Sequence, residues 1–411
     1  MMKDVLGARM VEAGAVDWPA LVTAARNLVA ERGLRGLSLR AVAGASGWTM
    51  GEIGYRVGKK EQLIALLLEA ERAASDAADH RWIDRLSSVP SFSGATLAAV
   101  VSGYLDDTAI NRREAAIFWE ELLLEAGIDP SLHALVAPWI EERERFWRQL
   151  LINRHPKAEA LARVIVKYVV GEQLYSVVLG ADPSYRLMRD MGIRRLCGGI
   201  LADAQAVESD LFDHLIDMLA PTEPIANFTK SSAWPVAQTT ATLMRDRGLS
   251  AITHRSVAAA LGVSPSAVAH HFRTHMDLVR AGNEALYEGF RENLDLDGVR
   301  RRLLPDPKEH GGAIGHQNAA VGLSRATHMI ALAGARDPAF APLVARRRKD
   351  RGQSTSLWGA ALFAHPERYD RCAAQVTSMV LGGDLFLAMA RGIASTGRLS
   401  AVMNDFVELA S

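Results

Sequence analysis

The stretch GLRGLSLRAVA at residues 33–43 returns as GLSAITHRSVA at residues 248–258, so this chain contains one segment twice. The match runs without a gap from Gly33 to Leu63 and from Gly248 to Leu278. Solenoid repeats recur every 20–50 residues or so, whereas the spacing between these two copies is long enough for a whole domain or more. We therefore expect two tandem units of one kind.

Each copy of the segment predicts a helix-turn-helix. Before Gly33, apolar residues follow the spacing of one helix face, at Leu21, Ala24, Ala25, Leu28 and Val29. Gly33 and Gly248 follow such helices, where a glycine can take the left-handed C-terminal conformation without steric cost.

Hydroxyl side chains then stand where helix N-caps are needed: Ser38 and Thr49 in the first copy, Thr253 and Ser264 in the second. Gly47 and Gly262 supply the tight turn, and Pro265 stands at a first helical position, where proline is tolerated. Three helices with a glycine turn between the last two are typical of proteins that place the third helix in the DNA major groove.

These residues resemble the DNA-binding motif of the TetR-type (TetR/AcrR) transcription regulators. That motif has Glu-x-Gly at the end of a helix, then Thr, Ile-Ala-x-x-Ala-Gly-Val-Ser, Tyr-x-His-Phe and Lys-x-x-Leu. The first copy gives ERG at 31–33, Ser38, VAGASGWT at 42–49, Val57 and KEQL at 60–63. The second gives DRG at 246–248, Thr253, VAAALGVS at 257–264, HF at 271–272 and Leu278.

Both copies depart from the motif, at a tyrosine of the helix that would read DNA and at a lysine before the fourth helix. The motif's tyrosine is Gly54 in one copy and Ala269 in the other, and its lysine survives as Lys60 but is His275 in the second. Gly51 and Gly54 within one short helix cost about 1 kcal/mol each relative to alanine. We call the helix-turn-helix of each copy its reader. The first reader is therefore expected to bind DNA more weakly, or in a more specialised way, than the second.

The resemblance implies an all-α fold of two tandem TetR-like units, each a helix-turn-helix domain followed by a helical ligand-binding and dimerisation domain, which together form a pseudo-dimer. Later echoes indicate that the whole unit is duplicated: Asp129-Pro130 returns as Asp337-Pro338, and VVGE at 169–172 returns as LGGD at 381–384. The expected domains are 1–65 and 66–219, a linker at 220–231, then 232–280 and 281–411. The expected dimerisation helices are roughly 157–181 with 193–219, and 366–394 with 399–410.

The partners expected from the resemblance are a double-stranded DNA operator and a small-molecule effector. The expected DNA-contacting residues are Ser38, Arg40, Thr49, Tyr55, Arg56, Lys59 and Lys60, with Thr253, Arg255, Ser264, Ser266, His270, His271 and His275. A metal site at His271 and His275 is not favoured, because a helix break separates them and no cysteine or carboxylate completes a tetrahedral set. The basic run at 346–351 is expected to be a solvated helix face.

Aromatic residues between positions 95 and 180 favour a small apolar effector in the first helical domain. The expected ligand-binding residues are Tyr104, Phe118, Trp119, Trp139, Trp147, Tyr168, Gln173 and Tyr175. The second domain offers Trp358, Phe363, Met379, Phe386 and His328. Each of these residues taken alone is more typical of a bundle core than of a pocket.

The resemblance implies a repressor that a small effector releases and that needs no cofactor, and the composition supports a cytoplasmic regulator. The net charge is zero, so contacts to phosphate would have to come from local basic patches. Cys197 and Cys372 lie in different halves and are expected to be buried thiols. The N-terminus predicts neither secretion nor a membrane span.

Two other functions remain open. One is a DNA-independent pseudo-dimer that binds a ligand or a partner after its reading helices have decayed. The other is a helical enzyme, which is disfavoured because the sequence has no nucleophile–base pair, metal spacing or glycine-rich phosphate loop. In the main prediction, the single chain is a pseudo-dimer that is also expected to be able to pair with a second copy of itself.

Overall fold

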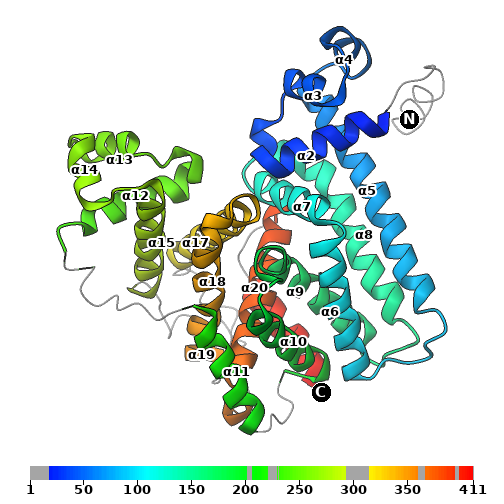
Figure 1. The fold of residues 1–411 in the computed structure, drawn as a ribbon. Coiled ribbons are helices and arrows are strands. Elements are labelled where there is room, and N and C mark those ends of the chain that lie inside the picture. Colours follow the sequence, from blue (N-terminus) through cyan, green and yellow to red (C-terminus); the bar gives the residue numbers. More distant parts are fainter. Residues whose placement is uncertain are drawn as a thin grey trace. The chain divides into compact units, whose positions relative to one another are not determined.

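The computed structural model describes residues 18–200, 206–220, 229, 231–292, 314–359, 366–393 and 398–410. Throughout these ranges the regular secondary structure is helical, which confirms the all-α class (Figure 1). The chain divides into two compact units between Ala78 and Asp79. The first unit carries one helix-turn-helix, and the second carries the other together with the helices of both halves.

The first helix-turn-helix consists of α2 (Trp18–Gly36), α3 (Leu39–Ser46) and α4 (Met50–Arg56), and α5 (Lys60–Arg85) follows it. The predicted apolar face of α2 is buried along its length. The predicted caps are confirmed, since the side chains of Ser38 and Thr49 accept hydrogen bonds from the backbone N–H groups of Ala41 and Glu52. Apolar periodicity and caps therefore fix this domain locally.

The second helix-turn-helix repeats this design. Its elements are α12 (Trp234–Arg247), the 3-10 helix η2 (Leu249–Ala251), α13 (His254–Leu261) and α14 (Pro265–His271), followed by α15 (His275–Glu292). Thr253 and Ser264 cap α13 and α14 as predicted, and Pro265 stands in the first turn. Gly47 and Gly262 end α3 and α13 in the left-handed conformation, with φ values of 76° and 70°.

The prediction for Gly33 and Gly248 is wrong in one torsion angle. Both have positive φ, 74° and 83°, but their ψ values of 169° and 175° are extended rather than left-handed helical. This backbone region is accessible essentially to glycine alone. The chain extends there because it must leave the first helix and reach the next N-cap.

Two runs of helices follow the motifs. The first run is α6 (Gly94–Ile110), α7 (Arg113–Ala126), η1 (Pro130–Leu132), α8 (His133–Leu151), α9 (Ala158–Leu179), α10 (Pro183–Gly198) and α11 (Ala206–Leu219). The second is α17 (Ile314–Arg336), η3 (Pro338–Phe340), α18 (Ala341–Lys349), α19 (Gln353–Gly359), η5 (Pro366–Arg368), α20 (Arg371–Ala390) and α21 (Arg398–Ala410).

The later echoes in the sequence correspond to equivalent structures. Asp129 and Asp337 each cap a short 3-10 helix by accepting a backbone hydrogen bond, from Ser131 and Ala339 respectively, at 2.9 Å in both cases. Each 3-10 helix leads directly into the next α-helix, α8 or α18. The shift that carries Asp129 onto Asp337 therefore relates α7–η1–α8 to the C-terminal part of α17 with η3 and α18.

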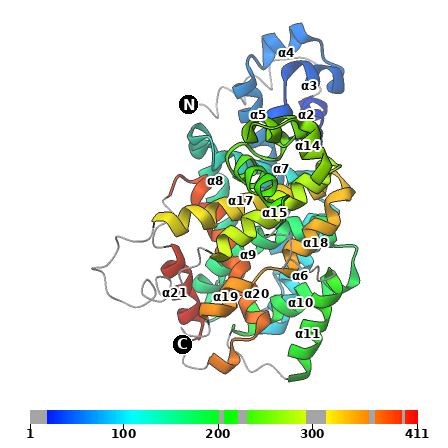
Figure 2. The ribbon, with the colours of Figure 1, turned by 90° about the vertical axis from the view of Figure 1, so that its left-hand side faces the viewer.

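Helices α9 and α20 form the central crossing between the two halves, side by side in both views (Figures 1 and 2). A Cβ at Gly171 would overlap the Met379 carbonyl group, and a Cβ at Gly383 would overlap the Lys167 carbonyl group. The two contacts are reciprocal, because a single shift along the chain carries Gly171 onto Gly383 and Lys167 onto Met379. Glycine at both positions lets the two backbones approach closely.

The outer partners of this crossing are also reciprocal, since α10 packs against α20 and α21 packs against α9. The prediction of one interface helix at 193–219 is wrong. Asp182 caps α10 just before Pro183, and α10 ends at Gly198, followed by Gly199 with a φ of 108°. The predicted linker at 220–231 lies largely outside the described residues.

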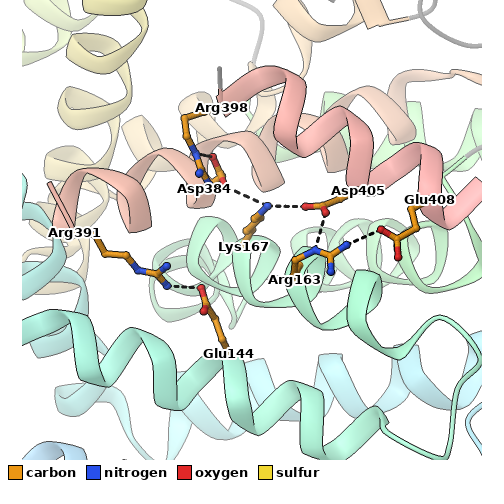
Figure 3. Close-up of polar contacts among 8 residues, drawn as sticks. All are labelled: Glu144, Arg163, Lys167, Asp384, Arg391, Arg398, Asp405 and Glu408. Atoms are coloured by element: carbon orange, nitrogen blue, oxygen red, sulfur yellow. Dashed lines mark hydrogen bonds and ion pairs between the residues drawn. The ribbon is translucent and has the colours of Figure 1, made fainter. Parts of the chain in front are cut away.

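Charged side chains complete the junction of the halves on one side (Figure 3). Lys167 Nζ on α9 lies 2.7 Å from Asp405 Oδ2 and 3.2 Å from Asp384 Oδ1. Arg163 pairs with Asp405 at 2.8 Å and with Glu408 at 2.7 Å. Arg398 pairs with Asp384, and Arg391 with Glu144. Each half therefore contributes two of these cations, and three of the four carboxylates belong to the second half.

Helix α20 is the one helix among the described residues that is long and apolar enough to cross a membrane. Its most apolar window is 78% buried within the protein, as in a core helix. The burial predicted for Cys197 and Cys372 is confirmed, and both thiols are free.

Candidate DNA-reading and effector sites

The predicted DNA-contacting residues lie mostly on open surface. Exposed side chains belong to Ser38, Arg40, Thr49, Tyr55, Lys59, Thr253, Arg255, Ser264, Ser266, His270 and His275, whereas Arg56, Lys60 and His271 are half-buried. Tyr55 is 89% exposed, unusual for an aromatic residue on a well-packed helix. The surface of each motif is thus available to an external partner.

The first reading helix begins with a capping box. Thr49 N donates to Glu52 Oε2 at 2.7 Å, and Glu52 N donates to Thr49 Oγ1 at 3.2 Å. The hydrogen bond from the Thr49 backbone lowers the pKa of Glu52, which therefore carries its negative charge at neutral pH. Glu52 thus stabilises the start of α4, although its negative charge would lie beside the phosphates of a bound DNA.

Lys60 makes an intramolecular contact, since its Nζ donates to the Arg35 carbonyl oxygen at 3.3 Å. In the second reader, His254 Nε2 lies 2.6 Å from the Phe272 carbonyl oxygen and joins α13 to the end of α14. His270 and His271 stack edge to face with ring centroids 5.4 Å apart. The second reader therefore presents imidazoles and serines where the first presents tyrosine, arginine and lysine.

The predicted ligand-binding residues are all buried, and five of them form two neighbouring aromatic groups that Arg143 contacts on both sides, at the Trp119 ring and at the Tyr104 hydroxyl. Trp139 packs on Trp119 and Phe118, with ring centroids 4.6 Å and 6.1 Å away. Tyr104 and Trp147 form a second group, 5.1 Å apart.

Of the remaining three predicted ligand-binding residues, Tyr175 and Gln173 hydrogen-bond to other groups, whereas the Tyr168 hydroxyl has no hydrogen-bond partner among the described residues. Tyr175 accepts a hydrogen bond from Arg351 Nε at 3.2 Å. Gln173 Nε2 donates to the Ala116 carbonyl oxygen at 3.4 Å. Burial raises the pKa of Tyr168 well above its ordinary value, so its hydroxyl stays protonated.

The Trp119–Trp139 group is set apart by polar atoms that lack partners. Within the described part of the chain, no hydrogen bond reaches Trp119 Nε1, Trp139 Nε1, Arg143 Nε or Gln173 Oε1. The Arg143 guanidinium lies 4.9 Å from the Trp119 ring centroid. Buried polar atoms are normally hydrogen-bonded, and leaving one unpaired costs about 1–3 kcal/mol. We call Trp119, Trp139 and Arg143, with Glu120 beside Trp119 on α7, the indole cluster.

A buried acid and a buried histidine from the two halves meet at the indole cluster. His328 Nε2 on α17 lies 3.2 Å from Glu120 Oε2 on α7, and the two residues are 7% and 0% exposed. Burial raises the pKa of Glu120, and His328 opposes that shift. The shift that carries Asp129 onto Asp337 also carries Glu120 onto His328, so a dimer of identical halves would place two like side chains here.

Sequence reasoning missed Glu120 and Arg143. Glu120 stands within the apolar run AAIFWEELLL at 115–124, where a charge facing the core is itself a signal. Arg143 lies in the charged stretch EERER at 141–145, which is typical of solvated surface. Phe363, offered for the second domain, lies outside the described residues.

The prediction of a solvated face at the basic run 346–351 is wrong. Arg347, Arg348 and Lys349 are 0%, 2% and 6% exposed. Arg348 forms a bidentate pair with Glu172 on α9, at 2.9 Å and 3.0 Å. The run is buried because it faces carboxylates of other helices, which the spacing along one helix does not reveal.

Two segments of the chain match known families. Residues 92–202 match the family described as "Tetracyclin repressor-like, C-terminal domain". Residues 237–281 match the family described as "Bacterial regulatory proteins, tetR family". The C-terminal type precedes the N-terminal type along the chain, the order expected where a second unit begins after a first has ended. No curated protein matches the chain significantly.

Proposed function

Because this chain belongs, through both matched domains, to the TetR family of DNA-binding regulators, we propose that it is a repressor that a small effector releases from its operator. The observation that carries the proposal is the pair of capped helix-turn-helix motifs with exposed polar and basic faces. We propose a cytoplasmic location and no catalytic activity. The indole cluster is the proposed effector site.

Arg255 is expected to contribute specificity to DNA binding. It stands exposed in the first turn of α13, and Arg40 takes the equivalent place in the first turn of α3. Replacing Arg255 by alanine should weaken operator binding by about 1–3 kcal/mol if it contacts a guanine with two hydrogen bonds. The effect of Arg40→Ala should be smaller, because the first reader is the more divergent one.

Gel-shift titrations with the chain's own upstream DNA at several salt concentrations measure this effect. Arg291→Ala is the matched control, because Arg291 is an exposed arginine near the end of α15, outside the motif. If both reader variants retain wild-type affinity and salt dependence, the DNA-binding proposal fails and a DNA-independent pseudo-dimer is favoured.

The operator is expected to be asymmetric. A homodimer with identical readers prefers a palindrome, with half-sites about 34 Å apart. This chain offers MGEIGYR at 50–56 in one reader and PSAVAHH at 265–271 in the other, so its two half-sites should differ in sequence. Footprinting with sedimentation should show one chain on a site with unlike halves. A perfect palindrome held by two chains, each using one reader, contradicts the pseudo-dimer.

The effector is expected to bind the indole cluster and to oppose DNA binding. A ligand that releases DNA must bind the DNA-free state of the protein more tightly than the DNA-bound state. Bound DNA must then lower the affinity for the ligand by the same factor by which the ligand lowers the affinity for DNA. A library of small aromatic molecules, screened by melting-temperature shift, supplies the probe. Its affinity is then measured with and without operator DNA, and equal affinities contradict the mechanism.

The variant Trp139→Phe should weaken that probe by about 0.5–1.5 kcal/mol, because it removes one unpaired N–H donor and keeps an aromatic ring. Trp147→Phe is the matched control, since Trp147 is equally buried in the neighbouring aromatic group. Equal losses for the two variants would place the effector outside the indole cluster.

A further inference from the structure

A second set of buried polar atoms without partners lies on the neighbouring helices α15 and α18. Asn283 on α15 and Arg347 on α18 are both 0% exposed. In the described structure, neither side-chain polar atom of Asn283 has a hydrogen-bond partner, and the same holds for Nε and Nη1 of Arg347. Burying an amide whose Oδ1 and Nδ2 are both unpaired costs free energy, so such groups are rare in native proteins and indicate a functional role.

Tyr287 connects these two residues, because Arg347 stacks on its ring and Asn283 lies one helical turn before it. Asn283 and Tyr287 are one turn apart on the same face of α15. The Arg347 guanidinium carbon lies 4.1 Å from the Tyr287 ring centroid, and its Nη2 pairs with Glu284 on the same helix and with Asp350 at 3.2 Å. The Tyr287 ring and the unpaired Nε and Nη1 of Arg347 therefore line the contact between α15 and α18, and the Asn283 amide is one turn away along α15.

The charges near this contact favour an anion. Arg346, Arg347 and Arg351 supply three positive charges, against the two carboxylates of Glu284 and Asp350. Asp350 is already engaged, by Arg346 at 3.3 Å, by Arg347, and by Gln353 at 3.0 Å. The excess cation and the unpaired donors on Arg347 match an oxygen-bearing anionic group, while Asn283 can pair with a neighbouring polar atom of the same ligand.

The repeat shows that this chemistry is particular to the second half. The shift that carries Asp129 onto Asp337 also carries Trp139 onto Arg347 and Arg143 onto Arg351. An indole of the first half's cluster is thus replaced by a guanidinium. The two halves differ in what they can bind.

We propose that Asn283 and Arg347, with Tyr287, form a second effector site that binds a small carboxylate- or phosphate-bearing molecule. Its regulatory use rests on the proposed function, because α15 directly follows the second reader in the chain. Ala281 and Ala285 on the other face of α15 pack against Ala237 and Ala241 of α12. A ligand between α15 and α18 therefore acts on the helix that supports this reader.

Binding is tested on the full chain without DNA, so that its outcome is independent of operator recognition. The probes are aliphatic and aromatic mono- and dicarboxylates and inorganic phosphate, measured by melting temperature and then by calorimetry. At least one probe should raise the melting temperature, and comparison of the carboxylates with phosphate shows which anion is preferred. Failure of every probe overturns the site.

Two variants locate the site. Asn283→Leu is nearly isosteric and removes the unpaired amide, so it should raise the melting temperature of the ligand-free chain. The same variant should lower the affinity for the anion at least about tenfold. Arg347→Met should lower the affinity for the anion at least as much. Arg291→Ala, which removes an exposed arginine near the end of α15, should leave anion affinity unchanged. Wild-type affinity in Asn283→Leu, or loss of binding in Arg291→Ala, overturns the assignment.

Discussion

Replacing Gly383 by alanine should destabilise the protein by about 3 kcal/mol, the upper end of the usual cost of overpacking. The added Cβ would overlap the Lys167 carbonyl group on α9, and a backbone cannot move aside as a flexible side chain can. Helices α9 and α20 would have to separate, which exposes the apolar surface that joins the two halves. Chemical unfolding followed by circular dichroism measures the loss.

The neighbouring glycine provides a control of opposite sign. A Cβ at Gly382 would lie 3.6 Å from Arg351 Nη1, an ordinary contact with the end of a side chain. Gly382→Ala should therefore be neutral or stabilise α20 by up to about 1 kcal/mol, because alanine is the better helix former. Gly171→Ala should resemble Gly383→Ala, since its Cβ would overlap the Met379 carbonyl group. Equal stability of the Gly382 and Gly383 variants would show that the close crossing is not maintained in solution.

Replacing Arg348 by methionine should cost about 3–5 kcal/mol, the usual cost of removing one member of a buried ion pair. Glu172 is 0% exposed and would lose both hydrogen bonds from Arg348, keeping the one that Tyr185 donates at 2.8 Å. A buried carboxylate without its cation is far costlier than the pair itself. The same unfolding measurement detects the loss.

Two comparisons test the cause of that loss. The double variant Arg348→Met with Glu172→Leu should regain much of the lost stability, because it removes the unpaired charge. Arg148→Met breaks a pair of similar length, 2.9 Å to Glu159, in which the two side chains are 45% and 55% exposed. An exposed pair contributes at most about 1 kcal/mol, so this variant should change little. If Arg148→Met and Arg348→Met cost the same, burial is not what makes the Arg348 pair important.

The sequence by itself determined the local structure of both motifs. Ser38, Thr49, Thr253 and Ser264 cap the helices that their positions predicted, because capping depends on a few neighbouring backbone groups. The repeat determined the tandem architecture, and the apolar periodicity determined which face of α2 is buried. The caps and the periodicity depend on interactions between residues close in the chain.

Only the tertiary structure decided which polar residues are buried and what they meet. Nothing near Arg348 in the chain shows that the distant Glu172 will neutralise it, nor that Glu120 will meet His328 across the repeat. The grouping of the aromatic residues likewise follows from how α6, α7 and α8 pack. Burial and charge pairing depend on residues brought together from distant parts of the chain, whereas periodicity records only which face of a helix turns inward.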